Sequence, residues 1–140
     1  MGDAICSQID VFTYDAFVKE RHKEIIGFIQ DSGGKVKLHI CGNITHLLPS
    51  IAELNCDIVD LDWQVDPEYA RSILGPEVVF TGNINPVEIQ DKTDEEVFLL
   101  TSELVQKLKN QKYILSAGCE ITVMTPVVNL HAMRRASAEG

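Results

Sequence analysis

Short apolar runs alternate with amphipathic segments along most of the chain. The apolar runs have the length and the β-branched content of buried strands, and they span residues 35–41, 57–62, 77–81 and 112–117. Apolar residues recur at helical spacing in three longer segments, which are residues 13–30, 44–54 and 97–108. The pattern predicts a helix followed by four successive strand–helix units.

Residues that favour helix ends stand between these segments. The first helix should end at residues 31–34, Asp-Ser-Gly-Gly, because these residues tolerate positive φ. Asp66-Pro67 has the form of an N-cap followed by proline at the first helical position, and residues 93–96 have the form of a capping box. Pro49 has to lie in the first turn of its helix or bend it. Residues 1–12 have no clear period and are compatible with a strand remnant or a loop.

Strands that alternate with helices predict an α/β fold with a parallel sheet and right-handed crossovers. A (β/α)8 barrel takes about 250 residues, so four units are about half of one, and we expect residues 1–140 to form a single domain. In parallel α/β sheets the functional site lies at the carboxyl ends of the strands. The unusual polar residues all fall at such ends, and they are His39, Cys41, Asp60, Asp62, Asn83, Cys119 and Glu120.

The chain has a formal net charge of -9 at pH 7 and no run of Lys and Arg, which argues against nucleic acid or an anionic membrane as a partner. No apolar stretch reaches the roughly 20 residues of a membrane span, and the first residues do not resemble a signal peptide. A cytoplasmic location is therefore expected. In that compartment the four cysteines favour metal binding or catalysis over disulfides, with Cys6 and Cys56 as structural residues.

Three side chains at predicted strand ends have the chemistry of metal ligands. His39 and Cys41 occupy positions i and i+2 of one strand and therefore point to the same face. Cys119 follows Gly118 at the end of another strand, and one His with two Cys is a ligand set suited to zinc. A cysteine on a parallel strand is more often a small buried apolar residue. The metal hypothesis thus depends on the three residues lying together.

Several other polar residues have ordinary structural interpretations. Asp60 and Asp62 could each be ion-paired at the end of a strand. Trp63 is expected to pack around the mouth of the site. The remaining histidines are expected on helix surfaces or at helix ends, and they are His22, His46 and His131.

Four motifs, taken in order, resemble the carboxyl-terminal half of the uroporphyrinogen decarboxylase superfamily. They are residues 39–43 (His-Ile-Cys-Gly-Asn), 57–62 (Asp-Ile-Val-Asp-Leu-Asp), 82–86 (Gly-Asn-Ile-Asn-Pro) and 113–120 (Tyr-Ile-Leu-Ser-Ala-Gly-Cys-Glu), followed by Thr125-Pro126 and Asn129-Leu130. Residues 3–29 also resemble the segment before the fifth strand in that superfamily. The resemblance implies a TIM-type (β/α)8 barrel whose first four strands are not in this chain.

Two branches of the superfamily differ in chemistry. Porphyrinogen decarboxylases use no metal and have a Gly-His-Gly sequence where this chain has Gly118-Cys119-Glu120. Zinc-dependent corrinoid methyltransferases carry a His-x-Cys pair and a distant Cys, which His39, Cys41 and Cys119 match. The resemblance implies methyl transfer from a methylated corrinoid, on a corrinoid protein or as free methylcobamide, to a small thiol such as coenzyme M, although tetrahydrofolate and other acceptors are also compatible. A metal-free decarboxylase-like enzyme and a non-catalytic assembly subunit are the alternatives.

This chemistry accounts for the ligand types. A coordinating thiol loses its proton, and three protein ligands leave the fourth tetrahedral position of zinc open to substrate. Asp62 is the first candidate to hold that position until substrate arrives, ahead of Asp60 and Glu120, and Asn83 could donate to substrate or order its own turn. A half barrel leaves sheet edges and an apolar inner face open. We therefore expect a homodimer or a complex with a separate amino-terminal half.

Overall fold

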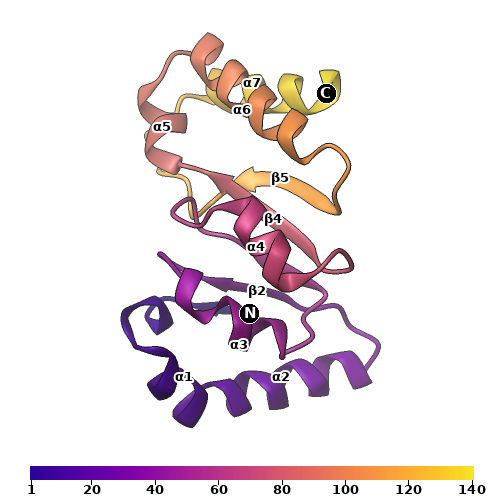
Figure 1. Ribbon diagram of the computed structural model, residues 1–140. Helices are drawn as coiled ribbons and strands as arrows, with labels where there is room; N and C mark the ends of the chain where they lie inside the picture. The colour runs from indigo at the N-terminus through magenta and orange to yellow at the C-terminus, as the bar shows by residue number, and fades with distance from the viewer.

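Five parallel strands form a single sheet in the computed structural model, which describes all residues from 1 to 140 (Figure 1). The strands are β1 (Gly2–Asp3), β2 (Lys37–Ile40), β3 (Ile58–Asp60), β4 (Val79–Ile84) and β5 (Tyr113–Ala117). Their order across the sheet is their order in the sequence. Neighbouring parallel strands joined by helical crossovers are the arrangement of a (β/α)8 barrel segment. The predicted α/β class is confirmed.

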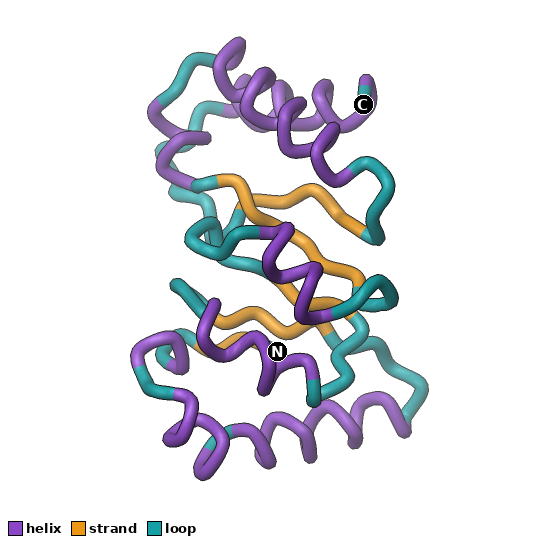
Figure 2. The backbone as a smooth tube through the Cα atoms, in the orientation of Figure 1, coloured by secondary structure: helices purple, strands orange, loops and turns teal.

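Helices connect the strands and extend beyond both ends of the sheet. They are α1 (Val11–Phe17), α2 (Lys19–Asp31), α3 (Leu48–Ala52), α4 (Pro67–Leu74), α5 (Pro86–Asp91), α6 (Asp94–Leu108) and α7 (Val127–Glu139), with short 3-10 helices η1 (Cys6–Gln8) and η2 (Thr45–Leu47). Helices α1 and α2 lie at one end of the molecule, and α6 and α7 pack together at the other (Figure 2). None of the helices combines the length and apolar character that crossing a bilayer requires.

The predicted helix starts are confirmed at the level of single hydrogen bonds. The Asp66 side chain accepts from the backbone N–H of Tyr69, with Pro67 in the first turn of α4. Thr93 and Glu96 form the capping box of α6. Local sequence chemistry thus determines where these helices begin.

Other element boundaries differ from the prediction. Residues 1–12 contain β1, which is too short to show a period, then η1 and the start of α1. The helix predicted over residues 13–30 is divided at Val18 into α1 and α2. The strand predicted at residues 77–81 runs instead over residues 79–84, because residues 82–84 still pair with β5. Pairing between distant segments, which local propensity does not report, causes the last difference.

The hydrophobic core lies between the sheet and the helices. Leu38, Val59 and Phe80 belong to it from three neighbouring strands. The apolar face predicted over residues 44–54 is confirmed, since its five members are all buried, namely Ile44, Leu47, Leu48, Ile51 and Leu54. Alternate residues along a strand point to opposite faces, so the other face of the sheet is free to carry different chemistry.

That other face would be the inside of a complete barrel, and across β2 and β3 it is polar. Lys37 and His39 point to this face from β2, and Asp60 lies beside His39 in the register of β3. Barrel interiors are usually filled by branched apolar side chains. The expected apolar inner face is therefore wrong for β2, and on β3 it is held by Ile58 alone beside Asp60.

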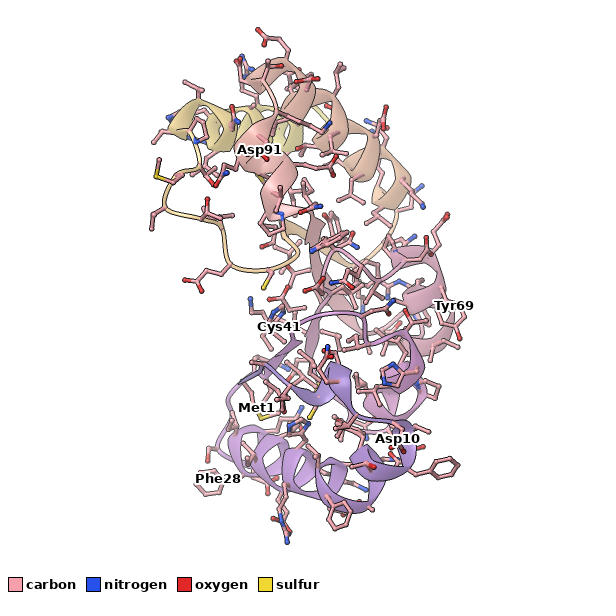
Figure 3. The ribbon with its side chains drawn as sticks, turned by 90° about the vertical axis from the view of Figure 1, so that its left-hand side faces the viewer. Met1, Asp10, Phe28, Cys41, Tyr69 and Asp91 are labelled. Carbon is pink, nitrogen blue, oxygen red and sulfur yellow. The ribbon has the colours of Figure 1, made fainter.

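The buried face of α1 and α2 coincides only in part with the apolar residues whose spacing predicts this helix, which are Phe17, Val18, Ile25, Phe28 and Ile29. Phe17 and Phe28 are largely exposed, and Phe28 points outward at the end of the molecule (Figure 3). Ile25 is about half exposed, whereas Val18 and Ile29 are partly buried against the core. The residues buried in their place are Tyr14, His22 and Ile26. The predicted surface position of His22 is wrong.

His22 belongs to a buried polar cluster beside β1. Its Nδ1 atom lies 3.0 Å from the Tyr14 hydroxyl, and its Nε2 atom lies 3.5 Å from Oδ2 of Asp3. The Cys6 thiol donates to the same Asp3 oxygen over 2.9 Å, in keeping with the structural role expected of this cysteine. These contacts attach helices α1 and α2 to the first strand.

Gly118 allows the loop after β5 to lie directly against the end of β3. A Cβ atom on Gly118 would stand 2.3 Å from the backbone nitrogen of Trp63, a distance that real Cβ atoms do not tolerate. Only glycine fits there without moving one of the two backbones. The side chain of Trp63 is 44% exposed, so the backbone of this residue makes the close approach.

We expect acid to destabilise the protein through His22. Burial lowers the pKa of His22, and the nearby Asp3 carboxylate offsets only part of this effect. The stability gained from neutral His22 is therefore complete above the unfolded-state pKa of about 6.5 and decreases as the pH falls below that value. Urea unfolding at about pH 7.5 and about pH 5.5 should show a smaller acid-induced loss of unfolding free energy for His22→Gln than for the wild type.

The exposed His131 of α7 provides a matched control. His131→Gln should lose as much stability on acidification as the wild type. A wild-type pH dependence in His22→Gln would show that His22 does not contribute to acid sensitivity.

Substitution of Gly118 should destabilise the fold. Gly118→Ala should lower the free energy of unfolding in urea by about 2 kcal/mol, because the backbones at Gly118 and Trp63 must separate. Gly27→Ala is the control, since Gly27 lies within α2 with nothing near its missing Cβ, and it should raise stability by about 0.5 kcal/mol. Equal effects of the two variants would contradict the packing argument.

Candidate metal centre

The three predicted ligands lie together at the carboxyl ends of the strands. Their candidate ligand atoms, His39 Nε2 or Nδ1, Cys41 Sγ and Cys119 Sγ, all lie within 4.8 Å of one another. The Cys41 sulfur is 3.3 Å from His39 Nε2 and 3.7 Å from the Cys119 sulfur. Cys41 lies near the centre of the molecule, far from the outer surface of α4 where Tyr69 projects (Figure 3).

These spacings fit a tetrahedral zinc ion. Two sulfur atoms that bind one Zn²⁺ at roughly 2.3 Å are roughly 3.8 Å apart in that geometry. Burial raises the pKa of the Cys41 thiol, and the adjacent Cys119 thiol raises it further. Two thiolates this close need a positive charge between them, which is what a divalent cation supplies.

Asp60 orients the imidazole of His39. The Nδ1 atom of His39 lies 3.2 Å from the backbone oxygen of Asp60 and 3.6 Å from its Oδ2 atom. Both atoms are acceptors, so the imidazole proton belongs on Nδ1 and the lone pair on Nε2 faces Cys41. A carboxylate behind the second nitrogen of a ligating histidine is common in metal sites.

Asp62 joins the loops around the site through backbone hydrogen bonds. The side chain is almost fully buried, and its Oδ2 accepts from Gly42 N–H over 2.8 Å while Oδ1 accepts from Gln64 N–H over 3.2 Å. Gly42 has a φ of 87°, a conformation suited to glycine. Asp62 is not one of the three clustered ligands, and its role as a temporary fourth ligand stays a prediction.

Asn83 of β4 supports the same loop. Its Nδ2 atom donates to the backbone oxygen of Val65 over 2.7 Å and lies 3.4 Å from that of Asp62. Ordering of the loop after β3 is therefore a visible role of this side chain. The alternative, a hydrogen bond to substrate, stays a prediction.

Sequence reasoning overlooked Lys37. Its ammonium group donates to Oδ2 of Asp60 over 2.8 Å, so the ion pair considered for Asp60 is present. The available signal was its place two residues before His39, which puts both side chains on one face of β2. Glu120, the least favoured candidate for the fourth ligand, is exposed beside Cys119.

Comparison with known proteins places the chain in a family. The model of the uroporphyrinogen decarboxylase (URO-D) family matches residues 1–139. A uroporphyrinogen decarboxylase of Drosophila virilis is 34% identical over 92 residues, which are 66% of this chain and 24% of that protein. A methylcobamide:CoM methyltransferase of Methanosarcina mazei is 27% identical over 121 residues, which are 86% of this chain and 34% of that protein.

A solved structure agrees with the fold. A methyltransferase from Methanosarcina mazei superposes with a TM-score of 0.85 at 20% sequence identity, over 99% of this chain and 41% of that one. The chain thus spans well under half the length of the proteins that it matches. Because the family model covers all but one residue, the chain belongs to the uroporphyrinogen decarboxylase family.

Proposed function

We propose that this chain carries the zinc site of a methyltransferase that moves a methyl group from a methylated corrinoid to a small thiol such as coenzyme M. The clustering of His39, Cys41 and Cys119 is the observation that supports this function. The family includes relatives of two kinds, decarboxylases and methyltransferases. The methyltransferase from Methanosarcina mazei is named for methylcobamide and coenzyme M, which we extend to this chain as part of the proposal.

The ligand types suit alkyl transfer. His39, Cys41 and Cys119 would hold the ion, and Asp60 keeps the imidazole proton on Nδ1. A bound Zn²⁺ would lower the pKa of the acceptor thiol, so that the acceptor would react as a thiolate near neutral pH. The thiolates of Cys41 and Cys119 would balance the divalent charge, which would leave an acceptor sulfur electron-rich and nucleophilic.

The proposed transfer is a nucleophilic displacement. An electron pair of the acceptor sulfur forms the new S–CH3 bond. The Co–C bond of the corrinoid breaks, and its electron pair stays on cobalt, while the thiol proton passes to solvent. We propose that Asp62 would hold the fourth ligand position of the ion until the acceptor displaces it.

A metal-free decarboxylase-like enzyme is the second candidate, favoured by the 34% identity to the Drosophila virilis decarboxylase. The presence of Cys119 within 3.7 Å of Cys41 argues for the zinc function instead. A non-catalytic assembly subunit would share the fold and lack turnover. Metal content separates the first two functions, and methyl transfer separates an enzyme from an assembly subunit.

Open surfaces support the proposal of a larger assembly. Strand β5 lies at the edge of the sheet, where Ile114 is 51% exposed beside a groove of about 970 Å³ against α7. Phe17 and Phe28, one on α1 and one on α2, are also largely exposed at the other end. Exposed strand edges and apolar patches of this kind favour association. We propose a homodimer or a complex with an amino-terminal barrel half.

The zinc content of protein purified without added metal tests the function. We expect about one zinc per chain in the wild type, because three protein ligands suffice for a catalytic site, and a loss of most of it in Cys119→Ser. Cys6→Ser should keep the metal, since Cys6 lies outside the site and a serine hydroxyl can also donate to Asp3. A folded wild type without zinc would rule out the zinc function and leave the decarboxylase-like alternative.

Methyl transfer is the second part of this test. We expect the zinc-loaded protein in its native assembly to methylate a small thiol when methylcobalamin is added. Cys119→Ser should reduce the rate of this methyl transfer about a hundredfold, because damage to a metal site typically causes losses of this order. Zinc binding without any turnover would identify an assembly subunit.

Sedimentation velocity tests the assembly. We expect a species at least twice the 15.6 kDa mass of the chain, because both sheet-edge and apolar surfaces need cover. Phe28→Glu should weaken a homodimer formed through α2, whereas Glu24→Gln on the same helix should not. A monodisperse monomer for the wild type would contradict the proposed assembly.

A further inference from the structure

Cys41 and Cys119 face each other as free thiols at the metal centre. All four cysteines of the chain are free, and the sulfur atoms of these two lie 3.7 Å apart. A disulfide bond is roughly 2.05 Å long, so the two sulfur atoms would have to approach each other by roughly 1.7 Å. The pair is therefore close enough to be oxidised to a disulfide after a small movement of its side chains.

The backbone on both sides of the pair can stay in place during such a movement. Neither cysteine belongs to a strand, since β2 ends at Ile40 and β5 ends at Ala117. The N–H of Cys41 donates to the backbone oxygen of Asp3 over 3.0 Å, and the N–H of Gly118 donates to that of Ile84 over 2.8 Å. Rotation about the two Cα–Cβ bonds moves the sulfur atoms and leaves these hydrogen bonds intact. Closing the gap thus requires no strand pairing to break.

Cys119 is the sulfur that a small oxidant reaches first. It lines the groove of about 970 Å³ against α7, and it also lines a pocket of about 430 Å³ on the inner face of the sheet. Cys41 lines neither of them. An accessible cysteine beside a less accessible one is the arrangement of an attacking and a resolving residue in cysteine redox sensors.

The two remaining cysteines are protected from the same chemistry. Burial raises the pKa of Cys6 to about 12 and the pKa of Cys56 to about 11, so both thiols stay protonated near neutral pH. The Cys6 thiol also donates to Asp3 over 2.9 Å. Oxidants react with the thiolate rather than with the thiol. Oxidation should therefore be confined to the pair at the metal centre.

We propose that Cys41 and Cys119 form a redox switch, in which a hydroperoxide converts the two metal ligands to a disulfide and empties the metal centre. The disulfide rests on the geometry of the cysteine pair, and only the loss of metal rests on the proposed zinc function. A disulfide has no thiolate left to bind zinc, and His39 alone is too few ligands to hold the ion. Methyl transfer would then proceed only under reducing conditions.

The proposed oxidation consists of two displacements. The thiolate of Cys119 attacks one oxygen atom of the hydroperoxide, the O–O bond breaks, and Cys119 becomes a sulfenic acid while hydroxide or an alkoxide leaves. The thiolate of Cys41 then attacks the Cys119 sulfur, forms the S–S bond and expels hydroxide. Two electrons pass from the sulfur atoms to the peroxide, and the expelled anions take up protons from water. A dithiol reverses the change by thiol–disulfide exchange.

Peroxide treatment of the zinc-loaded protein in its native assembly, purified under reductant, tests the switch. We expect hydrogen peroxide to release about one zinc for each disulfide formed, because the disulfide removes two of the three protein ligands. A chromogenic chelator measures the released zinc, and peptide mapping by mass spectrometry without reduction identifies the link between Cys41 and Cys119. Dithiothreitol should restore both thiols and the binding of zinc.

Two serine variants assign the reaction to the pair. Cys6→Ser should form the disulfide and release zinc as the wild type does, since Cys6 lies outside the metal centre and its thiol pairs with Asp3. Cys119→Ser, treated in the same way, should form no disulfide within the chain, because its attacking sulfur is missing. A disulfide in Cys119→Ser as abundant as in the wild type would contradict the assignment.

The outcomes separate the switch from the proposed function. Zinc release with Cys119 oxidised to a sulfinic acid, or with a disulfide that joins other cysteines or two chains, would overturn the switch and leave the zinc function intact. Protein that keeps its zinc and both free thiols in peroxide would do the same. A folded wild type that holds no zinc but forms the link between Cys41 and Cys119 would support the redox pair and remove the proposed function.

Discussion

The curvature of the parallel sheet is the constraint on which the candidate site depends. Strands β2 and β5 have two other strands between them, so a flat sheet would keep them roughly 14 Å apart. The sulfur atoms of Cys41 and Cys119, which follow these two strands, are nevertheless 3.7 Å apart. The sheet must therefore curl as a barrel wall does, and the loop after β5 must turn inward over its end. The lack of a side chain at Gly118 permits that turn.

The three candidate ligands could be selected from the sequence because their signals are local. His39 and Cys41 share a face through the period of a strand, and Cys119 follows a glycine at the end of another apolar run. Helix starts such as those at Asp66 and Thr93 were predictable for the same reason, since a cap involves residues within one turn. The surroundings of the ligands were not predictable in this way. The contact between His39 and Asp60 depends on the register of β2 against β3, which no short segment encodes.

Helix α2 shows how local composition can mislead. His22 stands among charged residues, which favours a surface position, yet it is buried together with Ile26, one turn further along. His22 can be buried because it has polar partners, since Asp3 and Tyr14 pair with its two imidazole nitrogens. A buried polar side chain is acceptable when it is paired, and the partner here comes from a two-residue strand at the start of the chain. The inner face of β2 and β3 follows the same rule, where the charge of Lys37 is balanced by Asp60.

The 78-residue separation between Cys41 and Cys119 has a topological consequence. Every strand pairing joins neighbours in the chain order, so most of the sheet can assemble by successive local additions. The sulfur contact instead joins the second unit to the last and closes a long ring. An ion held by both thiolates would act as a removable cross-link, and the chain-entropy model gives such a ring closure about 4.5 kcal/mol of stabilisation. Ion binding would then stabilise the curved sheet, and the curved sheet would in turn strengthen ion binding.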